Sequence, residues 1–415
     1  MNTLERPSPV FLWLVALLLA FLVSACGGGG GGEGGVSPPQ TFSTNSAPGA
    51  PGTLLPGSAP ASSTSPTVTS SNPSQGATNV AVSTVESTNA LLPKSISATF
   101  SEPMNPASLL SPATTFTLKE TLSGLGIAGT VILNAAHTVA TFMPTGPLPL
   151  NTQLTAIITT AATTATGTAL ASGYGWSFTT GSQVGQAPIN LKTAASFLVL
   201  SGTSITNTST TANPTRVNGQ LGINPGTAAN VTGFTDSTPA GTGLILTGGI
   251  QSGPLVRQAN LDLSAALAEA NARTSLQTVI SNNELALFTV NGGSPGNYPP
   301  GLYTSATTLT LSAGDMTLDA QGDPDAVWVF KTASSLTVGD ARQMRLLNGA
   351  RAKNVFWAVG SSALIGDRAS FKGNILAGSS CTVGTAAASG TAVEGRVLSI
   401  SQLQLNYASI NAPAP

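Results

Sequence analysis

The sequence contains a group of four aspartates whose close spacing could support catalysis or metal binding. They lie close together in the chain and are Asp315, Asp319, Asp323 and Asp325. Paired carboxylates are the catalytic groups of many enzymes that cleave polysaccharides. No histidine or basic side chain flanks this group to activate a sugar, and Asp323-Pro324-Asp325 is typical of a turn. We therefore interpret the four acids as structural, with catalysis or calcium binding as the alternative.

Other catalytic and metal chemistry has little support. His137 is the only histidine, so neither a Ser-His-Asp triad nor a His-rich metal site can be assembled in the C-terminal half. Ser334, Ser361 and Ser379 recur in one repeated frame, which argues against a unique nucleophile. The Gly-rich run 27–35 follows no expected strand, so it is not a phosphate-binding loop. We expect no catalytic residue, no metal and no cofactor.

Cys26 is the residue with the clearest expected modification. Phe11–Val23 is an apolar run that follows Arg6 and is too short to span a bilayer comfortably. It ends in Leu22-Val23-Ser24-Ala25-Cys26, which looks like a bacterial lipobox, in which small residues precede a cysteine that receives diacylglycerol. We expect residues 1–25 to be a lipoprotein signal peptide. A plain signal peptide that ends beside a cysteine is the alternative.

The composition is that of an exported protein. Only 7% of the residues are charged and 5% are aromatic, as in extracellular proteins built from short strands and turns. Cys26 and Cys381 are the only cysteines, so acylation of Cys26 leaves no disulfide available. Gly27 is not the Asp of an inner-membrane retention signal, so in a host with two membranes we expect the outer membrane or cell surface. The net charge of −1 and the absence of a Lys/Arg cluster argue against a nucleic-acid partner.

The chain divides into a tether and two β-rich domains. Residues 26–66 are rich in Gly, Pro, Ser and Thr, which predicts a disordered tether with a reach of roughly 30–40 Å. Residues 67–181 contain short alternating segments that predict a small β-sandwich. Three motifs resemble the bacterial Ig-like domain of S-layer and surface proteins; they are Thr99–Met104, Leu148–Thr152 and Trp176–Gly181. Such modules usually act as spacers. The expected strands are Ile96–Phe100, Thr115–Leu118, Thr130–Leu133, Val139–Phe142, Leu154–Ile158 and Trp176–Phe178.

A repeat dominates residues 189–415. Four copies share one frame and are Ser334–Gly339, Ser361–Gly366, Ser379–Gly384 and Ser401–Asn406, in which we expect Asn406 to take over a left-handed turn position from Gly. Each copy follows an apolar strand, which indicates one solenoid coil per copy. Period-two alternation predicts two inward columns. They are Leu336, Ala363, Cys381 and Leu403, and Val338, Ile365, Val383 and Leu405. The outward residues are then Thr337, Leu364, Thr382 and Gln404.

One segment has helical periodicity instead. Leu255 to Thr274 contains no Gly or Pro, and we expect a helix of about four to five turns along the solenoid. Asp262, Glu269 and Arg273 fall on or near its outer face. The expected inner stripe is Val256, Ala259, Leu263, Ala266, Leu267 and Ala270.

A set of motifs in this half resembles the microbial ice-binding protein family. In order, they are Asn218–Gly226, Val231–Phe234, the helix, Gly301–Tyr303, Leu318–Phe330, Leu347–Ala350, Asn354–Trp357 and Phe371–Ile375. The resemblance implies a triangular β-solenoid with one long flanking α-helix. With the Ig-like β-sandwich that precedes it, the expected fold of the whole chain is mainly β. It also implies a flat outer face that adsorbs to ice and inhibits ice growth and recrystallisation.

The expected partners are ice and, through the N-terminal lipid, a membrane. Charges hold their own hydration shells, and Asp340, Asp367 and Arg368 lie beside the expected ice-facing column. The alternative is therefore a surface adhesin or envelope-structural solenoid that binds a glycan or a protein. The candidate ice-facing residues are Thr227, Asn230, Thr232, Thr337, Thr382, Thr385 and Thr391.

Overall fold

A computed structural model describes residues 65–110, 114–208, 215–234, 243–245, 249–385 and 390–414. Residues 62–415 form one compact unit. The expected signal peptide, Cys26 and nearly all of the tether lie outside the described residues. Within the described ranges, no helix is long and apolar enough to cross a membrane.

The first folded region is a β-sandwich. Its two antiparallel sheets have the strand orders β1-β4-β7-β6 and β5-β8-β9. The six strands expected from the sequence are confirmed, and the rings of Phe116, Phe142 and Trp176 pack between the sheets at centroid distances of 5.8 Å. The elements are β1 (Val68–Asn72), β4 (Ile96–Phe100), α1 (Pro106–Leu110), β5 (Phe116–Glu120), β6 (Gly129–Leu133), β7 (Val139–Pro144), β8 (Gln153–Ile158) and β9 (Tyr174–Thr179). A third small sheet joins β2 (Ser83–Val85), β3 (Leu91–Pro93) and β10 (Val184–Gln186).

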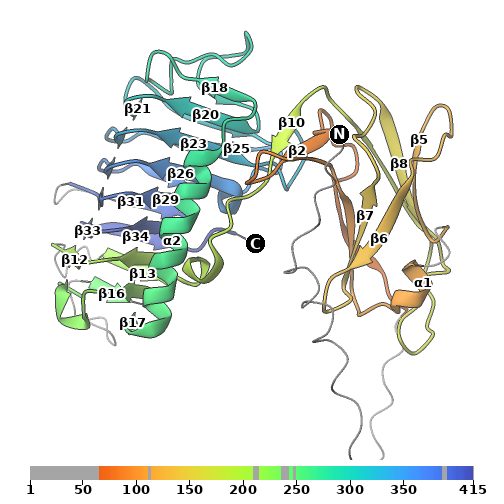
Figure 1. The fold of residues 1–415 in the computed structure, drawn as a ribbon, viewed down its shortest axis with the longest axis horizontal. Coiled ribbons are helices and arrows are strands. Elements are labelled where there is room, and N and C mark those ends of the chain that lie inside the picture. Colours follow the sequence, from red (N-terminus) through yellow and green to blue (C-terminus); the bar gives the residue numbers. More distant parts are fainter. Residues whose placement is uncertain are drawn as a thin grey trace, which may run out of the picture. The chain divides into compact units, whose positions relative to one another are not determined.

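The second region is a β-solenoid of parallel strands in three sides (Figure 1). The helix-covered sheet contains, in spatial order, β17 (Ile250–Gln251), β14 (Leu221–Ile223), β11 (Val199–Ser201), β32 (Val397–Ser399), β29 (Asn374–Ala377), β26 (Val355–Val359), β23 (Trp328–Thr332), β20 (Gly301–Ser305) and β18 (Gln277–Val279). The threonine sheet contains β15 (Val231–Thr232), β12 (Ser204–Asn207), β33 (Gln402–Leu405), β30 (Ser380–Val383), β27 (Ala363–Ile365), β24 (Leu336–Val338) and β21 (Leu309–Leu311).

Two smaller sheets make the third side. A bridge between Gln343 and Ser370 joins them. One contains β16 (Gly243–Ile245), β13 (Thr215–Asn218), β34 (Ala408–Asn411), β31 (Thr391–Glu394) and β28 (Ser370–Lys372), and the other β25 (Met344–Leu347), β22 (Met316–Asp319) and β19 (Asn297–Tyr298).

The coils do not follow one another in chain order. Strands β11, β12 and β13 near the start of the domain pair in parallel with β32, β33 and β34 at its end. After β17 the chain must therefore return to the opposite end of the stack to begin β18. The nine strands of the helix-covered sheet extend over about 38 Å at the usual strand spacing. Helix α2 (Pro254–Ala272), with 19 residues, covers about 28 Å of that return.

Helix α2 packs along the helix-covered sheet (Figure 1), as expected. Val256, Ala259, Leu263, Ala266 and Ala270 are buried, and their mostly small side chains allow close contact with the sheet. The sheet thus has apolar neighbours on both sides, which explains why its strands are continuous apolar runs, as in Val355–Val359.

Two charged residues expected on the outer face of the helix are buried instead. Asp262 accepts hydrogen bonds from the backbone N–H and hydroxyl of Thr193 and from Gln258. Arg273 pairs with Glu269 at 2.6 Å and donates to the carbonyls of Ala187 and Pro188. Both charges have polar partners at the segment that enters the domain, which offsets the cost of removing them from water.

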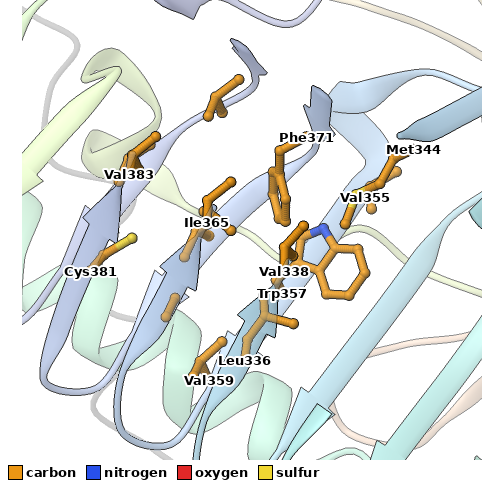
Figure 2. Packing of buried hydrophobic residues seen from close by; sticks show 14 of the residues in the cluster. Leu336, Val338, Met344, Val355, Trp357, Val359, Ile365, Phe371, Cys381 and Val383 are labelled. Carbon is orange, nitrogen blue, oxygen red and sulfur yellow. The ribbon is translucent and has the colours of Figure 1, made fainter. Parts of the chain in front are cut away.

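The interior of the solenoid is a stack of aromatic and aliphatic side chains, part of which Figure 2 shows. Tyr303, Phe330 and Trp357 occupy neighbouring strands in register, and the last two rings stack at 4.2 Å with an interplanar angle of 10°. The Trp357 indole N–H donates to the carbonyl of Lys372, so its polar atom is satisfied. The two inward columns predicted from the repeat are confirmed, because all eight side chains are buried.

The end of the repeat differs from the expectation. Gly384 has a φ of +76°, but Asn406 is not among the residues with positive φ, and Tyr407 holds that conformation at +52°. Instead, the Asn406 side-chain amide donates to the Gly384 carbonyl at 2.7 Å. Asn406 therefore serves as a hydrogen-bonding link between coils.

We predict that Cys381 is unreactive in the folded protein. Its side chain is 1% exposed, and burial raises the pKa of the thiol to about 12, so the nucleophilic thiolate is nearly absent at neutral pH. The test uses the chain from residue 27 onward, in which Cys381 is the only cysteine. Ellman's reagent is expected to label it in concentrated urea but not in native buffer, with Cys381→Ala as the blank. Rapid labelling under native conditions would contradict this burial.

Candidate functional site

The outward side of the threonine sheet carries a regular row of side chains. One residue from each of its seven strands lies in this row because the strands pair in register. Five of the seven are threonines. In spatial order the row is Thr232, Thr206, Gln404, Thr382, Leu364, Thr337 and Thr310.

A second row of mostly hydroxyl side chains runs beside the first, two residues earlier in each strand. Ser204, Gln402 and Ser380 are in register, and Ser362, Ser335 and Thr308 directly precede β27, β24 and β21. Along a strand the two rows are about 6.6–6.8 Å apart, and along the stack the residues repeat at about 4.7–4.9 Å. We call the two rows together the threonine face. Neither row contains a charged residue, but the Glu284 carboxylate lies at the end of the first row and accepts the Thr310 hydroxyl at 2.9 Å.

The backbone beneath this face is held firmly. The residues that alternate with the outward threonines, such as Leu336 and Val338 around Thr337, are at most 1% exposed. Each strand pairs with its neighbours, and a threonine side chain has few rotamers because it is branched at Cβ. The hydroxyl and methyl groups therefore form an array with little conformational freedom.

The structure assembles some of the predicted ice-facing residues into one row. Thr232, Thr337 and Thr382 all belong to it. Thr206 and Thr310 were missed, although Ser204-Ile205-Thr206 repeats the pattern of Ser380-Cys381-Thr382, a signal that could have identified Thr206. The two strands that flank the four recognised copies in this sheet are β21 and β12. They were not recognised because their sequences match only part of the repeated frame.

Thr227 and Asn230 lie beside this row in the turn that leads to β15. They bracket the short 3₁₀ helix Ala228–Asn230, and the Asn230 side-chain oxygen accepts from the Thr227 backbone N–H at 2.9 Å and from its hydroxyl at 3.2 Å. Both residues are exposed. Their polar groups are thus engaged in shaping the turn.

Thr385 and Thr391 lie outside the threonine face. Thr385 follows β30 and binds both carboxylate oxygens of Asp367, through its backbone N–H at 2.6 Å and its hydroxyl at 3.0 Å. Asp367 is itself buried, so it is not a surface charge beside the row as expected. Thr391 is a correction: it is 0% exposed on the third side, where its hydroxyl donates to the Gly366 carbonyl.

Each of the four clustered aspartates has a structural partner. Asp315 accepts from the Gln343 backbone N–H and pairs with Arg345 at 3.1 Å. Asp319 accepts from the Gln321 backbone and the Asn348 amide, both at 2.8 Å. Asp323 pairs with Lys94 at 2.9 Å, and Asp325 binds Asn72. Their carboxylates thus brace turns and strands. In the part of the chain that the structure describes, no group of three His, Cys, Asp or Glu residues could hold a metal ion.

The repeated serines and the single histidine also have structural positions. The backbone N–H groups of Ser361, Ser379 and Ser401 each donate to the carbonyl of the preceding serine in the stack, at 2.8, 2.8 and 3.0 Å. His137 is exposed in the β6–β7 turn, with a φ of +56°. Neither the serines nor His137 are among the partners of the four aspartates.

The sequence profile of the Ice-binding-like family matches residues 199–411, which is just over half of this chain. The chain belongs to the Ice-binding-like family. A second profile, that of the Bacterial Ig-like domain, matches residues 62–180. The ice-binding-like domain thus contains the threonine face, from its first strand, β12, to its last, β33.

Relatives of the ice-binding-like domain occur in several organisms. The ice-binding protein of Nostoc sp. is 36% identical over 195 residues, which cover 47% of this chain and 64% of that protein. Ice-binding protein 1 of Shewanella frigidimarina is 31% identical over 227 residues, covering 50% of this chain and 24% of that protein. The crystal structure of an ice-binding protein from an Antarctic biological consortium matches with 34% identity and a TM-score of 0.48, covering 56% of this chain and 94% of that one. This chain therefore spans less than two thirds of the length of the first two relatives.

Glu284 closes one end of the threonine sheet. Its backbone bridges Thr310 of the end strand β21. Burial tends to raise the pKa of the Glu284 carboxyl, but hydrogen bonds from Ser312 and Thr310 outweigh burial and hold that pKa below its ordinary value of 4.5. The ionised form is therefore favoured by folding.

We predict a pH-dependent contribution of Glu284 to stability. Because its pKa is lower in the folded state, the stabilisation is present above the unfolded pKa and is lost as pH falls through and below 4.5. Glu284→Gln is expected to lower the urea midpoint near neutral pH and to match the wild type in acid. The control is Glu86→Gln, at an exposed position after strand β2. A pH-independent difference between Glu284→Gln and wild type would exclude this linkage.

Proposed function

We propose that this protein binds ice through the threonine face and thereby inhibits ice growth and recrystallisation. The observation that supports this most directly is the in-register row of seven residues, five of them threonines, on a parallel sheet. Membership of the Ice-binding-like family supports it independently, as do relatives whose names state that they are ice-binding proteins. This function is non-enzymatic.

The physical basis is ordered water on a rigid surface. Hydroxyl groups hold water by hydrogen bonds, while the threonine methyl groups between them limit competing orientations. Because the backbone ladder already fixes the array, little conformational entropy is lost when the array meets a solid lattice. Apart from the Glu284 carboxylate at the Thr310 end, the rows carry no charge, which avoids strongly bound hydration shells that differ from ice.

We further propose that the protein acts from the cell envelope. Lipid attached to Cys26 would hold the chain at a membrane, and the 26–66 tether would place both domains beyond the lipid surface. Such display would restrict ice binding to the neighbourhood of the cell. A freely secreted inhibitor would act throughout the medium.

The second candidate function is adhesion to a glycan or a protein through the same face. Leu364, Gln402 and Gln404 interrupt the two hydroxyl rows near their middle. Leu364 is 36% exposed, and long amide side chains are more mobile than threonine. These three residues would suit a softer ligand better than a lattice.

The ice proposal predicts the effect of a bulky side chain within the row. Thr382→Tyr should project a ring above the flat face and raise the protein concentration needed to inhibit recrystallisation by about tenfold or more, equivalent to about 1.4 kcal/mol. The growth of ice crystals in splat-cooled sucrose samples measures this inhibition. The matched control is Thr317→Tyr, an outward and half-buried threonine on the third side. Equal activity of the two variants would exclude the threonine face, and inactive wild-type protein at high concentration would favour adhesion.

The envelope proposal predicts that membrane association depends on Cys26 and not on Cys381. Cys26→Ser should abolish incorporation of radiolabelled palmitate and move the protein from the membrane fraction to the soluble fraction. Cys381→Ala, which removes the buried thiol, should leave both properties unchanged. Persistent membrane association of unlabelled Cys26→Ser would show that lipid at this residue is not the anchor.

A further inference from the structure

A second surface of the ice-binding-like domain concentrates positive charge. It is a groove of about 500 Å³ on the helix side of the solenoid. Its walls come from the entering segment 188–195, from the turn before β26 and from the residue that precedes β32. We call it the cationic groove. Its polar and aromatic lining includes Asn190, Lys192, Lys353, Asn354, Phe356 and Arg396.

We propose that the cationic groove binds a carboxylate-bearing saccharide. Three of the fifteen basic residues of the chain line this one groove, namely Lys192, Lys353 and Arg396, and no acidic residue lines it. Among the described residues, none of the three takes part in an ion pair. In a protein in which 7% of residues are charged, this leaves an unusual local excess of positive charge.

Arg396 is the central observation. Its guanidinium is half-buried, and its two hydrogen-bond acceptors are neutral, namely the Ala195 carbonyl at 2.9 Å and the Asn374 side-chain oxygen at 3.0 Å. Burial lowers the pKa of this group, yet a guanidinium keeps its charge at any physiological pH. The two contacts orient the fork without neutralising it. An arginine held in this way favours a planar, bidentate anion such as a carboxylate.

The nearest carboxylates are engaged elsewhere. Asp262 interacts electrostatically with Lys192, but it is 6% exposed and accepts hydrogen bonds from Thr193 and Gln258. Glu394 pairs with Lys372 at 2.9 Å. Neither acid lines the groove, so the three cations there remain available to a ligand.

The lining of the groove favours a saccharide over a membrane. The large apolar side chains that line this shallow groove, Ile189, Leu191 and Phe356, are all buried, so none of them can insert into a bilayer. Phe356 is 3% exposed and forms an apolar floor. The exposed Asn190 amide offers a polar group near the cations, whereas the Asn354 amide is buried and donates to the Pro324 carbonyl at 3.0 Å. An apolar floor with a few polar groups and a charge is the usual composition of a small-ligand site. This surface is separate from the threonine face, so the inference does not depend on ice binding.

The test measures binding of a fluorescein-labelled alginate hexamer by anisotropy. The chain from residue 27 onward is used, which leaves the compact unit 62–415 whole. Lys192→Gln/Lys353→Gln removes two charges from side chains that are not buried and should weaken binding by at least tenfold. Arg396→Gln should weaken it further. The matched control, Lys119→Gln/Arg257→Gln, removes two charges from outside the groove and should bind like wild type.

Several outcomes would overturn the proposal. They are no binding of the alginate hexamer at millimolar concentration, equal binding of neutral maltohexaose, and unchanged affinity of the Lys192/Lys353 double variant. Groove-dependent binding to vesicles containing phosphatidylglycerol, without binding to alginate, would assign the groove to a membrane instead. Thermal unfolding verifies that each variant is folded. The double variant should retain wild-type ice activity, so failure of either function is distinguishable from failure of the other.

Discussion

The ladder between the first and last coils is the interaction on which the rest of the solenoid depends. Strands β11, β12 and β13 have β32, β33 and β34 as neighbours on all three sides. Without this ladder the threonine sheet would separate into blocks of two and five strands. Both blocks would expose unpaired edges, which are prone to pair with other chains. The continuity of the threonine face is therefore a result of backbone pairing between distant segments.

Helix α2 follows from the same constraint. A chain that places its first coils beside its last ones has to return along the stack, and a helix makes this return with its own hydrogen bonds satisfied. The small side chains of Ala259, Ala266 and Ala270 let the helix lie close to the helix-covered sheet. The helix thereby covers part of one side of the solenoid. Of the sheets on the other two sides, the threonine sheet is the largest, with seven strands against five and three, and it is available for binding.

Local features of this fold could be predicted from the sequence, and long-range ones could not. The alternation of apolar and polar residues in repeats such as Ser334–Gly339 correctly separated inward from outward residues. Successive side chains of a strand point to opposite faces of the sheet, so this feature is local. The spatial order of the coils has no such local signal, so Thr206 was not placed beside Gln404. Asp262 and Arg273 were assigned to the outer helix face because periodicity describes polarity and cannot identify a distant partner such as Thr193 or Ala187. Thr391 was misassigned although alternation in β31 places it on the inward side together with Val393.

The interleaved coil order also has a consequence for the time at which this domain can be completed. Thr203 and Ser401, which are hydrogen-bonded, lie 198 residues apart in the chain. Contacts of such sequence separation slow folding because a long loop has to close before they form. During synthesis, strands β11, β12 and β13 can pair with β14, β15 and β16, but their other edges have no partner until the C-terminal strands emerge. The last segment therefore completes the stack by filling the gap between its first coils and the others. A chain truncated before β32 would lack a continuous face even though all five threonines of the first row would be present.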